Sequence, residues 1–345
     1  MTLIATRVQN LREKSYLDKY EHRASRHGAF DLFKSQTDDP NGLITPELTE
    51  KARASIGSQL QTPVINFDAG VAIGNQRLLQ IADSENTSAM VNINFATLAW
   101  GFTVVPTLYH NNEIGYDRDF ETKFVKYLNA LAAAVDTLCA ASLLANSTAV
   151  FADQLNYNLV GGALQAPWTT REQLYGDLVP IMAANNYFDQ LHIVGNGGVE
   201  ALARNLTEKG LYNEINKQLQ YSDKIMHFTN RIANAAGVYG TGYAVNGGSV
   251  GILHRLEREA LFGGKAATGH EFGTAVLPML DLEVGTYYYE SVGDFNAIAG
   301  AASADMNRVI KHHYGFAVDL ALLTRYNSRP GVDAEPIIRF QILSA

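Results

Sequence analysis

Residues that could do chemistry are few in this sequence, and the clearest candidate is a serine in a glycine-rich turn. The run fits the pattern G-x-S-x-G and reads Gly247-Gly248-Ser249-Val250-Gly251. It follows a possible strand and precedes a predicted helix, the context in which a nucleophile elbow exposes its serine. Acid and histidine candidates follow in the order of a hydrolase, as Asp281 or Asp294 and then His312 or His313.

The surrounding sequence argues against a serine hydrolase. The preceding strand, TGYAVN, is short and polar, whereas an elbow strand is normally a buried apolar run. Residues 1–115 also lack the alternating strands and helices of a hydrolase sheet. We therefore retain the serine hydrolase only as an alternative.

Two other glycine runs could cradle phosphate, and both lack a required residue. Gly195-Asn196-Gly197-Gly198 follows a strand and opens a helix, but Glu200 at the third fingerprint position would repel a pyrophosphate. Gly263-Gly264-Lys265 has Glu259 in place of the earlier glycine of a phosphate loop and Ala266 in place of the Ser or Thr. We expect a turn with a helix start at the first run and no phosphate site at the second.

The remaining candidates favour packing over chemistry. His270-Glu271 has no second histidine at metal-ligand spacing, and His312-His313 point to different faces of a helix or strand. The single cysteine, Cys139, lies within an apolar helical stripe, where a buried structural residue is the expected role. Tyr287-Tyr288-Tyr289 could stack bases, but in a strand it places two rings on one face and one on the other. We expect no catalytic, cofactor-binding or metal-binding residues and no cofactor.

One long helix organises the elements around these residues. The segment from Asp117 to Asn146 contains no Gly or Pro, and Asp117 or Asp119 could cap its start. Its apolar residues fall at the three-and-four spacing of a single buried stripe, at Phe120, Phe124, Tyr127, Leu128, Leu131, Val135, Leu138 and Cys139. The alanines beside this stripe would let other backbone approach closely, which suits a spine.

Composition indicates a chain with much interface. Only 18% of the 345 residues are charged, which is low for a monomer that must cover itself in solvent. The net charge is −8, yet residues 1–27 hold six Lys or Arg against three acidic residues. This asymmetry favours contact of the amino-terminal segment with nucleic acid or an acidic partner, and a solvated helical face explains it equally well. We expect no signal peptide and no membrane span.

Before the spine, the sequence predicts helices and then extended chain. We expect a charged helix over residues 3–27, a loop over 35–41 and a helix over 45–60. Residues 76–81 and 89–97 flank a polar turn and predict a long hairpin, which Trp100, Phe102 and Val104 continue until Pro106. Because an isolated two-stranded ribbon is marginal in water, this hairpin should lie on another surface.

After the spine, short strands alternate with helices, which predicts a compact α/β region. We expect strands over 191–194, 243–245, 283–292, 315–323 and 337–343, and helices over 199–209, 212–234 and 250–261. The last two strands are expected to pair with each other around the turn at residues 327–331.

This succession resembles the major capsid protein of tailed double-stranded DNA bacteriophages, the HK97-like fold. The resemblance lies in the arm, the hairpin, the spine ending in LCAASLLANSTAVF and the closing strands GFAVDLALLTRY and IIRFQIL. It implies an α+β fold with residues 1–60 as the N-terminal arm and 61–115 as the extended hairpin (E-loop) region. Residues 116–170 and 310–345 would form the peripheral domain with its spine helix, and 171–309 the α/β axial domain.

The resemblance implies a structural, self-assembling subunit and no enzyme. Copies would form hexamers and pentamers of an icosahedral shell around packaged phage DNA, which they would contact non-specifically. Scaffolding, portal and decoration proteins are the other implied partners, with no membrane. The protein would reside in the virion capsid and assemble in the bacterial host cytoplasm. An encapsulin-like compartment shell is a further alternative. No charged scaffolding segment and no motif for a Lys to Asn cross-link is visible.

Overall fold

The fold was obtained as a computed structural model. It describes residues 4, 6–9, 27–39, 42–55, 59–65, 88–106, 115–151, 153–207, 220–221, 224–256, 260, 263–265, 269–278, 280–294, 308–327 and 334–345. Helices lie against the faces of β-sheets that are mostly antiparallel, so the predicted α+β class is confirmed.

The elements with described bounds are five helices, a 3₁₀ turn and fifteen strands, and residues 6–9 are also helical. The helices are α3 (Gly28–Thr37), α4 (Pro46–Ala54), α5 (Tyr116–Ala145), α6 (Leu174–Ala184) and α7 (Gly197–Thr207), and the 3₁₀ turn η2 spans Trp168–Thr170. The first strands are β1 (Gln59–Ile65), β2 (Ser88–Asn94), β3 (Ala96–Val104), β4 (Asn158–Val160), β5 (Ala163–Ala166), β6 (Leu191–Gly195), β7 (Gln220–Tyr221) and β8 (Lys224–Phe228). The others are β9 (Val238–Asn246), β10 (Val250–Arg255), β11 (Gly264–Lys265), β12 (Glu271–Leu277), β13 (Leu282–Asp294), β14 (Arg308–Thr324) and β15 (Ile337–Leu343).

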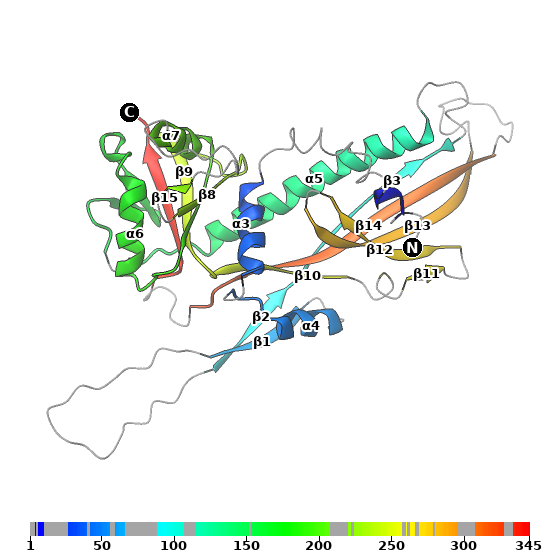
Figure 1. Ribbon diagram of the computed structural model, residues 1–345, viewed down its shortest axis with the longest axis horizontal. Coiled ribbons are helices and arrows are strands. Elements are labelled where there is room, and N and C mark those ends of the chain that lie inside the picture. Colours follow the sequence, from blue (N-terminus) through cyan, green and yellow to red (C-terminus); the bar gives the residue numbers. More distant parts are fainter. Residues whose placement is uncertain are drawn as a thin grey trace, which may run out of the picture.

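Helix α5 is the predicted spine, and its bounds differ from the prediction by one residue at each end. It runs along most of the molecule in Figure 1. The buried stripe is confirmed apart from two positions, because Leu138 is exposed and Tyr127 is only partly buried. Gly115 is the N-cap and no side chain caps the helix, so the predicted capping by Asp117 or Asp119 is wrong.

A six-stranded sheet lies below α5 in Figure 1. We call this sheet and α5 together the body. The strand order is β10-β14-β13-β12-β11, with β3 paired to β14. Strand β14 is long enough to pair with β13, β10 and β3 along its length. Aromatic residues of α5 and the sheet interlock, as where the Phe102 ring lies 5.3 Å from Phe120 and 5.5 Å from Tyr314. This packing explains why the apolar stripe of α5 is buried.

A seven-stranded sheet lies at one end of α5 and forms a second unit. We call this sheet, α6 and α7 together the lobe. The strand order is β4-β5-β15-β9-β6-β8-β7, and the β5–β15 and β6–β8 pairs are parallel. One face packs against α6 and α7 through Ile193, Phe340 and Tyr175. Val194 and Val245 on the other face belong to the same core cluster as α3 and α5. In Figure 1 the lobe stands at the left, with the C-terminus beside it.

A buried aspartate of α5 joins this helix to α3 and to the lobe. Asp136 of α5 is fully buried, and its carboxylate accepts a hydrogen bond from the Phe30 backbone N–H of α3 at 3.0 Å. The same carboxylate accepts a hydrogen bond from the Thr229 hydroxyl, next to β8. Here α3 approaches β8 so closely that a Cβ on Gly28 would lie 2.4 Å from the Phe228 nitrogen. Glycine at residue 28 therefore allows this contact.

Several predicted elements differ from the structure. Residues 250–255 form strand β10 and not a helix, because Ile252 packs into one core cluster and Leu253 into another. A strand that is buried on both faces has a continuous apolar run, which periodicity cannot distinguish from a helix. Within the stretch predicted as mostly helical, residues 224–228 form strand β8. The helix predicted over 45–60 ends at Ala54, and β1 begins at Gln59.

The predicted pairing of the last two strands is also wrong. β15 has the predicted bounds, but it pairs with β9 and β5 in the lobe. β14 lies in the sheet of the body, so the chain crosses from one sheet to the other between them. Strand periodicity predicts which residues are extended, but it does not predict which strands pair.

Candidate assembly surfaces

The serine of the G-x-S-x-G run does not form a nucleophile elbow. The run connects strand β9 to strand β10, so no helix follows the serine. Ser249 is 0% exposed and its hydroxyl has no hydrogen-bond partner among the described residues. Its backbone N–H donates to the Gln36 side-chain oxygen at 3.0 Å. A buried hydroxyl without a base in hydrogen-bond reach cannot act as an activated nucleophile.

The acid and histidine candidates are engaged elsewhere. Lys34 pairs with Asp281 at 3.3 Å, and Tyr288 hydrogen-bonds His312 at 2.6 Å. His313 hydrogen-bonds the Thr103 and Ser291 hydroxyls at 3.0 and 2.7 Å, respectively. His312 and His313 thus lie on opposite faces of β14, as predicted. The side chain of Asp294 lies outside the described residues.

Replacing Ser249 with alanine is expected to leave stability unchanged or to raise it by up to about 1 kcal/mol. The substitution removes a buried hydroxyl that has no hydrogen-bond partner in the described part of the chain, and such a group is costly to bury. Urea unfolding measures the change, and activated-ester hydrolysis should stay at background in both proteins. Gln36→Ala is the control, and it should cost about 2 kcal/mol because the Ser249 and Val250 N–H groups lose their acceptor. Ester turnover that disappears in Ser249→Ala would restore the hydrolase alternative.

The glycine run at residues 195–198 is a strand end and a helix start, as predicted. Asn196 lies between β6 and α7, and its side-chain oxygen accepts from the Gly198 and Thr241 N–H groups, both at 3.2 Å. A Cβ on Gly198 would lie 2.0 Å from the Tyr239 carbonyl oxygen, so this glycine allows α7 to pack closely on β9. The run at residues 263–265 forms a turn into the short strand β11, which is no helix N-terminus that could hold phosphate.

The other candidates have structural surroundings. Cys139 is fully buried in the stripe of α5, and burial raises the pKa of its thiol well above the ordinary value. Tyr287 and Tyr289 lie on one face of β13 and Tyr288 on the other, where it packs 5.3 Å from Tyr314. Among the described residues, no group of three or more His, Cys, Asp or Glu side chains could hold a metal ion.

By length and composition alone, α5 could cross a membrane, contrary to the sequence expectation that no segment is long and apolar enough. In this fold α5 is a core helix, with eleven buried residues that include Asp136. A buried stripe of this kind accounts for its apolar composition.

The clearest surface for assembly is a two-stranded ribbon formed by β1 and β2. The strands pair antiparallel from Gln59 with Asn94 to Ile65 with Ser88, and neither has another strand partner among the described residues. In Figure 1 the ribbon leaves the body obliquely, beside α4. The first strand of the predicted hairpin, at residues 76–81, lies outside the described residues. The second predicted strand, at residues 89–97, is interrupted at Phe95 and divides into β2 of the ribbon and β3 of the body.

Among the ribbon side chains that the structure describes, the buried ones lie at its base. Leu60 of β1 and Ile93 of β2 are buried against Ala52, Leu253 and Ala321. Towards the other end of the described ribbon, Met90 is 60% exposed. A two-stranded ribbon is marginally stable by itself in water, so the part beyond the base needs a further surface.

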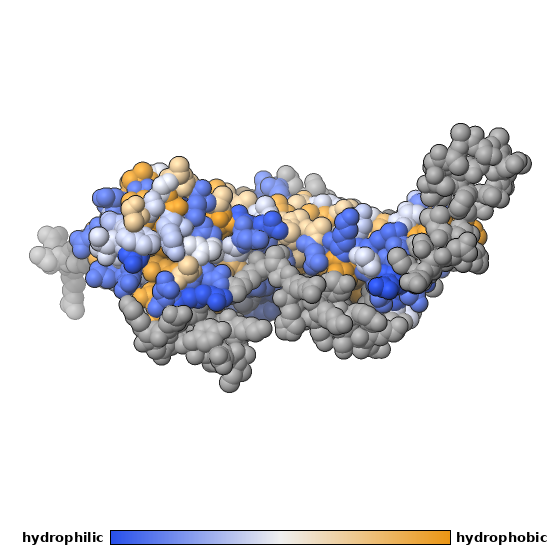
Figure 2. Space-filling view, turned by 90° about the horizontal axis from the view of Figure 1, so that it is seen from above, coloured by the Kyte–Doolittle hydropathy of each residue, from blue (hydrophilic) through white to orange (hydrophobic). Residues whose placement is uncertain are grey.

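Apolar side chains also remain exposed elsewhere. Val292 of β13 and Ile310 of β14 are directly opposed in the sheet and both are exposed, far from the lobe. The others on the helices and in the lobe include Leu138, Leu144, Leu155, Val160, Val179 and Phe188. Figure 2 shows apolar residues interspersed with polar ones on the face seen from above. Single exposed apolar residues are ordinary, whereas the Val292 and Ile310 pair forms a local patch.

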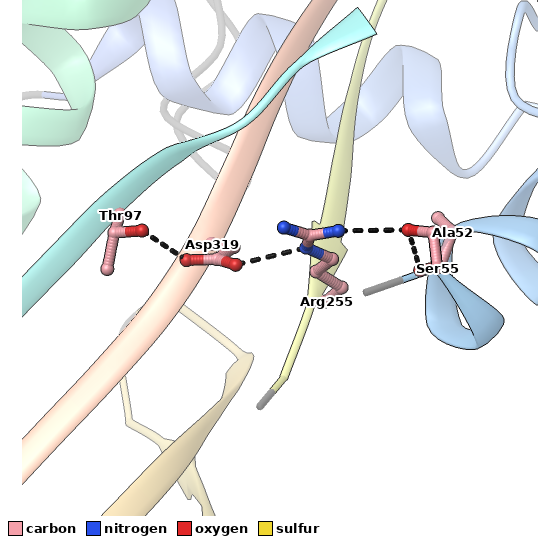
Figure 3. A network of polar contacts seen from close by, with 5 residues as sticks. All are labelled: Ala52, Ser55, Thr97, Arg255 and Asp319. Carbon is pink, nitrogen blue, oxygen red and sulfur yellow. Dashed lines mark hydrogen bonds and ion pairs between the residues drawn. The ribbon is translucent and has the colours of Figure 1, made fainter. Parts of the chain in front are cut away.

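A set of polar contacts holds the base of the ribbon, and we call it the clamp. Arg255 of β10 donates to the Asp319 carboxylate at 3.0 Å and to the Ser55 hydroxyl at 2.9 Å. The other oxygen of Asp319 accepts from the Thr97 hydroxyl at 2.6 Å. Figure 3 shows these residues in line, with Arg255 between Asp319 and Ser55. The Arg255 guanidinium also lies 4.1 Å from the centroid of the Phe95 ring.

Comparison with known proteins finds similarity to solved phage structures. The chain is similar to a structure described as Mycobacterium phage Bobi, with 12% identity, a TM-score of 0.48, and coverage of 93% of this chain and 92% of that one. It is similar to the capsid structure of the cyanophage P-SCSP1u, with 12% identity, a TM-score of 0.46 and 84% coverage of both chains. For a structure described as Gordonia phage Cozz the identity is 11%, the TM-score 0.46, and the coverage 93% of this chain and 88% of that one. No family model and no curated protein matches the chain.

Sequence reasoning missed three polar sites. Asp136 interrupts an apolar helix, and that position alone could have marked it as a buried hydrogen-bond acceptor. His192 and His227 form a buried pair on adjacent strands, with 3.3 Å between His192 Nδ1 and His227 Nε2. Arg255 and Asp319 are 64 residues apart, and only the pairing of β10 with β14 brings them together.

Proposed function

We propose that this chain is the major capsid protein of a tailed double-stranded DNA phage, a structural subunit that assembles with copies of itself and has no catalytic site. The observation that carries the proposal is the ribbon, which is packed at its base and has no second strand partner beyond it among the described residues. A two-stranded ribbon is marginally stable alone, so its outer edges and exposed side chains fit contact with another copy. A closed shell would repeat that contact at every copy.

The order of elements supports the same role. An arm, a ribbon, a long spine helix over a sheet and an α/β lobe follow one another in the order that the sequence resemblance implies. We propose residues 1–60 as the arm, 61–115 as the hairpin region, 116–170 and 310–345 as the peripheral domain and 171–309 as the axial domain. Hexamers and pentamers would then form the shell around double-stranded DNA.

The proposal extends to partners and location. Scaffolding and portal proteins are the partners that shell assembly would require, and decoration proteins could add to them. The chain would reside in the virion capsid after assembly in the host cytoplasm. The basic residues at 1–27 could face packaged DNA, while the net charge of −8 would limit tight binding of phosphates that must leave again.

Shortening the ribbon is expected to abolish closed particles without unfolding the chain. The variant replaces residues 62–91 with a short Gly/Ser linker and keeps the buried pair of Leu60 and Ile93 at the base. Weakening each contact by about 1.4 kcal/mol lowers a pairwise association constant about tenfold, and this loss repeats at every copy in a shell. Electron microscopy counts closed particles, and a cooperative thermal melt checks the fold.

A matched control separates loss of the ribbon from a general defect. Replacing only the exposed Met90 with glutamine keeps the length of the ribbon and should lower the yield of particles less than the shortened variant does. Closed particles at normal yield from the shortened variant would contradict the proposed contact between subunits.

A further inference from the structure

The two ends of the ribbon meet the body at neighbouring points. Ser55 is the C-cap of α4 and shortly precedes β1, while Thr97 lies in β3, just after β2 ends. Both side chains reach toward the junction of β10 and β14 (Figure 3). The chain entering the ribbon and the chain leaving it are thus tied to the same part of the sheet.

The clamp lies across three adjacent strands in register. Arg255 of β10 is directly opposite Asp319 of β14, and Asp319 is directly opposite Thr97 of β3. Directly opposed residues project from the same face of a sheet, so the three side chains form a row. Asp319 stands at its centre and uses one carboxylate oxygen for each neighbour.

The ion pair within the row is shielded from water, whereas Thr97 at one end of the row is exposed. The side chains of Arg255 and Asp319 are 8% and 13% exposed, respectively. Charge-assisted hydrogen bonds are directional, and an arginine fork restricts the angle at which its partners lie. Arg255 also covers Phe95, the residue at which the chain changes from the ribbon to the body.

The apolar contact beneath the ribbon does not supply this direction. Leu60 and Ile93 rest on Leu253 and Ala321, which are small or aliphatic surfaces. Hydrophobic contact is non-directional, so it holds the base down without fixing the angle at which the ribbon leaves. The polar row next to it provides a buried directional element, beside the exposed hydrogen bond that Lys51 of α4 donates to the Gln61 carbonyl of β1 at 2.9 Å.

We propose that Arg255 is a positioning residue, and that the clamp of Arg255, Asp319, Ser55, Thr97 and Phe95 fixes the direction in which the ribbon leaves the body. This positioning role belongs to the single chain and does not depend on assembly. Its consequence for assembly rests on the proposed function: each copy would present its ribbon at one angle, as a closed shell requires.

The test measures the direction of the ribbon in the purified chain in solution, before assembly is triggered. Spin labels are placed at Met90→Cys on the ribbon and Val276→Cys on β12, both exposed positions. The native Cys139 is fully buried, so the reagent should modify the introduced cysteines. Pulsed electron paramagnetic resonance then gives the distribution of distances between the labels. With the clamp intact, we expect one narrow distribution.

The decisive variant combines Arg255→Met with Asp319→Asn, which leaves no buried charge without its partner. The ribbon-to-body distribution should broaden by about two-fold or more once the charge-assisted bonds are lost. A second label pair at Val276→Cys and Val292→Cys lies wholly within the body and should keep its width. An unchanged body width with a cooperative melt shows that the body has not unfolded.

A matched pair elsewhere is the control. Arg204 and Glu200 form an ion pair at 2.8 Å on α7, far from the ribbon, and Arg204→Met with Glu200→Gln should leave both widths unchanged. An unchanged ribbon distribution in the clamp variant would overturn the proposal, as would a broad one in the parent chain. Because the measurement is made on unassembled chains, its failure is distinct from failure to form particles.

Discussion

Leu131→Asp is expected to leave the chain in the insoluble fraction. Leu131 lies in the middle of the buried stripe of α5 and is 6% exposed. The substitution would bury a carboxylate among apolar side chains, which should lower the free energy of unfolding by about 4 kcal/mol or more. A domain has about 5–15 kcal/mol of stability in total, so little would remain. Soluble yield after expression, followed by circular dichroism of any soluble fraction, measures the effect.

The control introduces the same charge at an exposed position of the same helix, less than one turn away. Ala134 is exposed, and Ala134→Asp should change stability by about 0.5 kcal/mol and leave the chain soluble. If Leu131→Asp were soluble, helical and as stable as Ala134→Asp, the apolar stripe of α5 would face solvent and not the core.

Acid is expected to destabilise the lobe through its buried histidine pair. Burial lowers the pKa of His227 to about 3 from an ordinary value of 6.5, and burial also lowers the pKa of His192. Below pH 6.5 the unfolded chain takes up a proton at His227 that the folded chain does not, so stability falls as the pH falls from about 6.5 toward 3. His227 alone should cost about 2 kcal/mol at pH 5, seen as a lower urea midpoint than at pH 7.

His227→Gln isolates this effect because glutamine can still hydrogen-bond His192 but does not titrate. The difference in stability between pH 7 and pH 5 should be smaller in the variant by about the same 2 kcal/mol. An equal loss in the two proteins would assign the acid sensitivity to other groups.

The sequence predicted the long elements well where one physical signal dominates. The spine has one uninterrupted apolar stripe and few competing interpretations, so its bounds were predicted to within one residue. In strand β15, Arg339 and Gln341 alternate with apolar residues, and its bounds too were predicted correctly, although its pairing was not. Strand β10 was predicted as a helix because it is buried on both faces, which removes the alternation that identifies a strand.

The candidate surfaces could be predicted only in part. The marginal stability of a two-stranded ribbon is a general property, so the need for a partner surface follows from the hairpin pattern alone. The clamp could not be predicted, because Arg255, Asp319 and Thr97 meet only through the register of β10, β14 and β3. Register depends on which residues of distant strands face each other, and the local pattern does not contain that information.

Electron microscopy of particles isolated from cells that produce the intact chain tests the proposed role most directly. We expect closed polyhedral shells of uniform size that contain double-stranded DNA protected from nuclease. A chain that remains monomeric, or that forms only small open oligomers with its ribbon intact, would contradict the role of a shell subunit. Closed shells filled with protein cargo and free of DNA would contradict the phage capsid and indicate an encapsulin-like compartment.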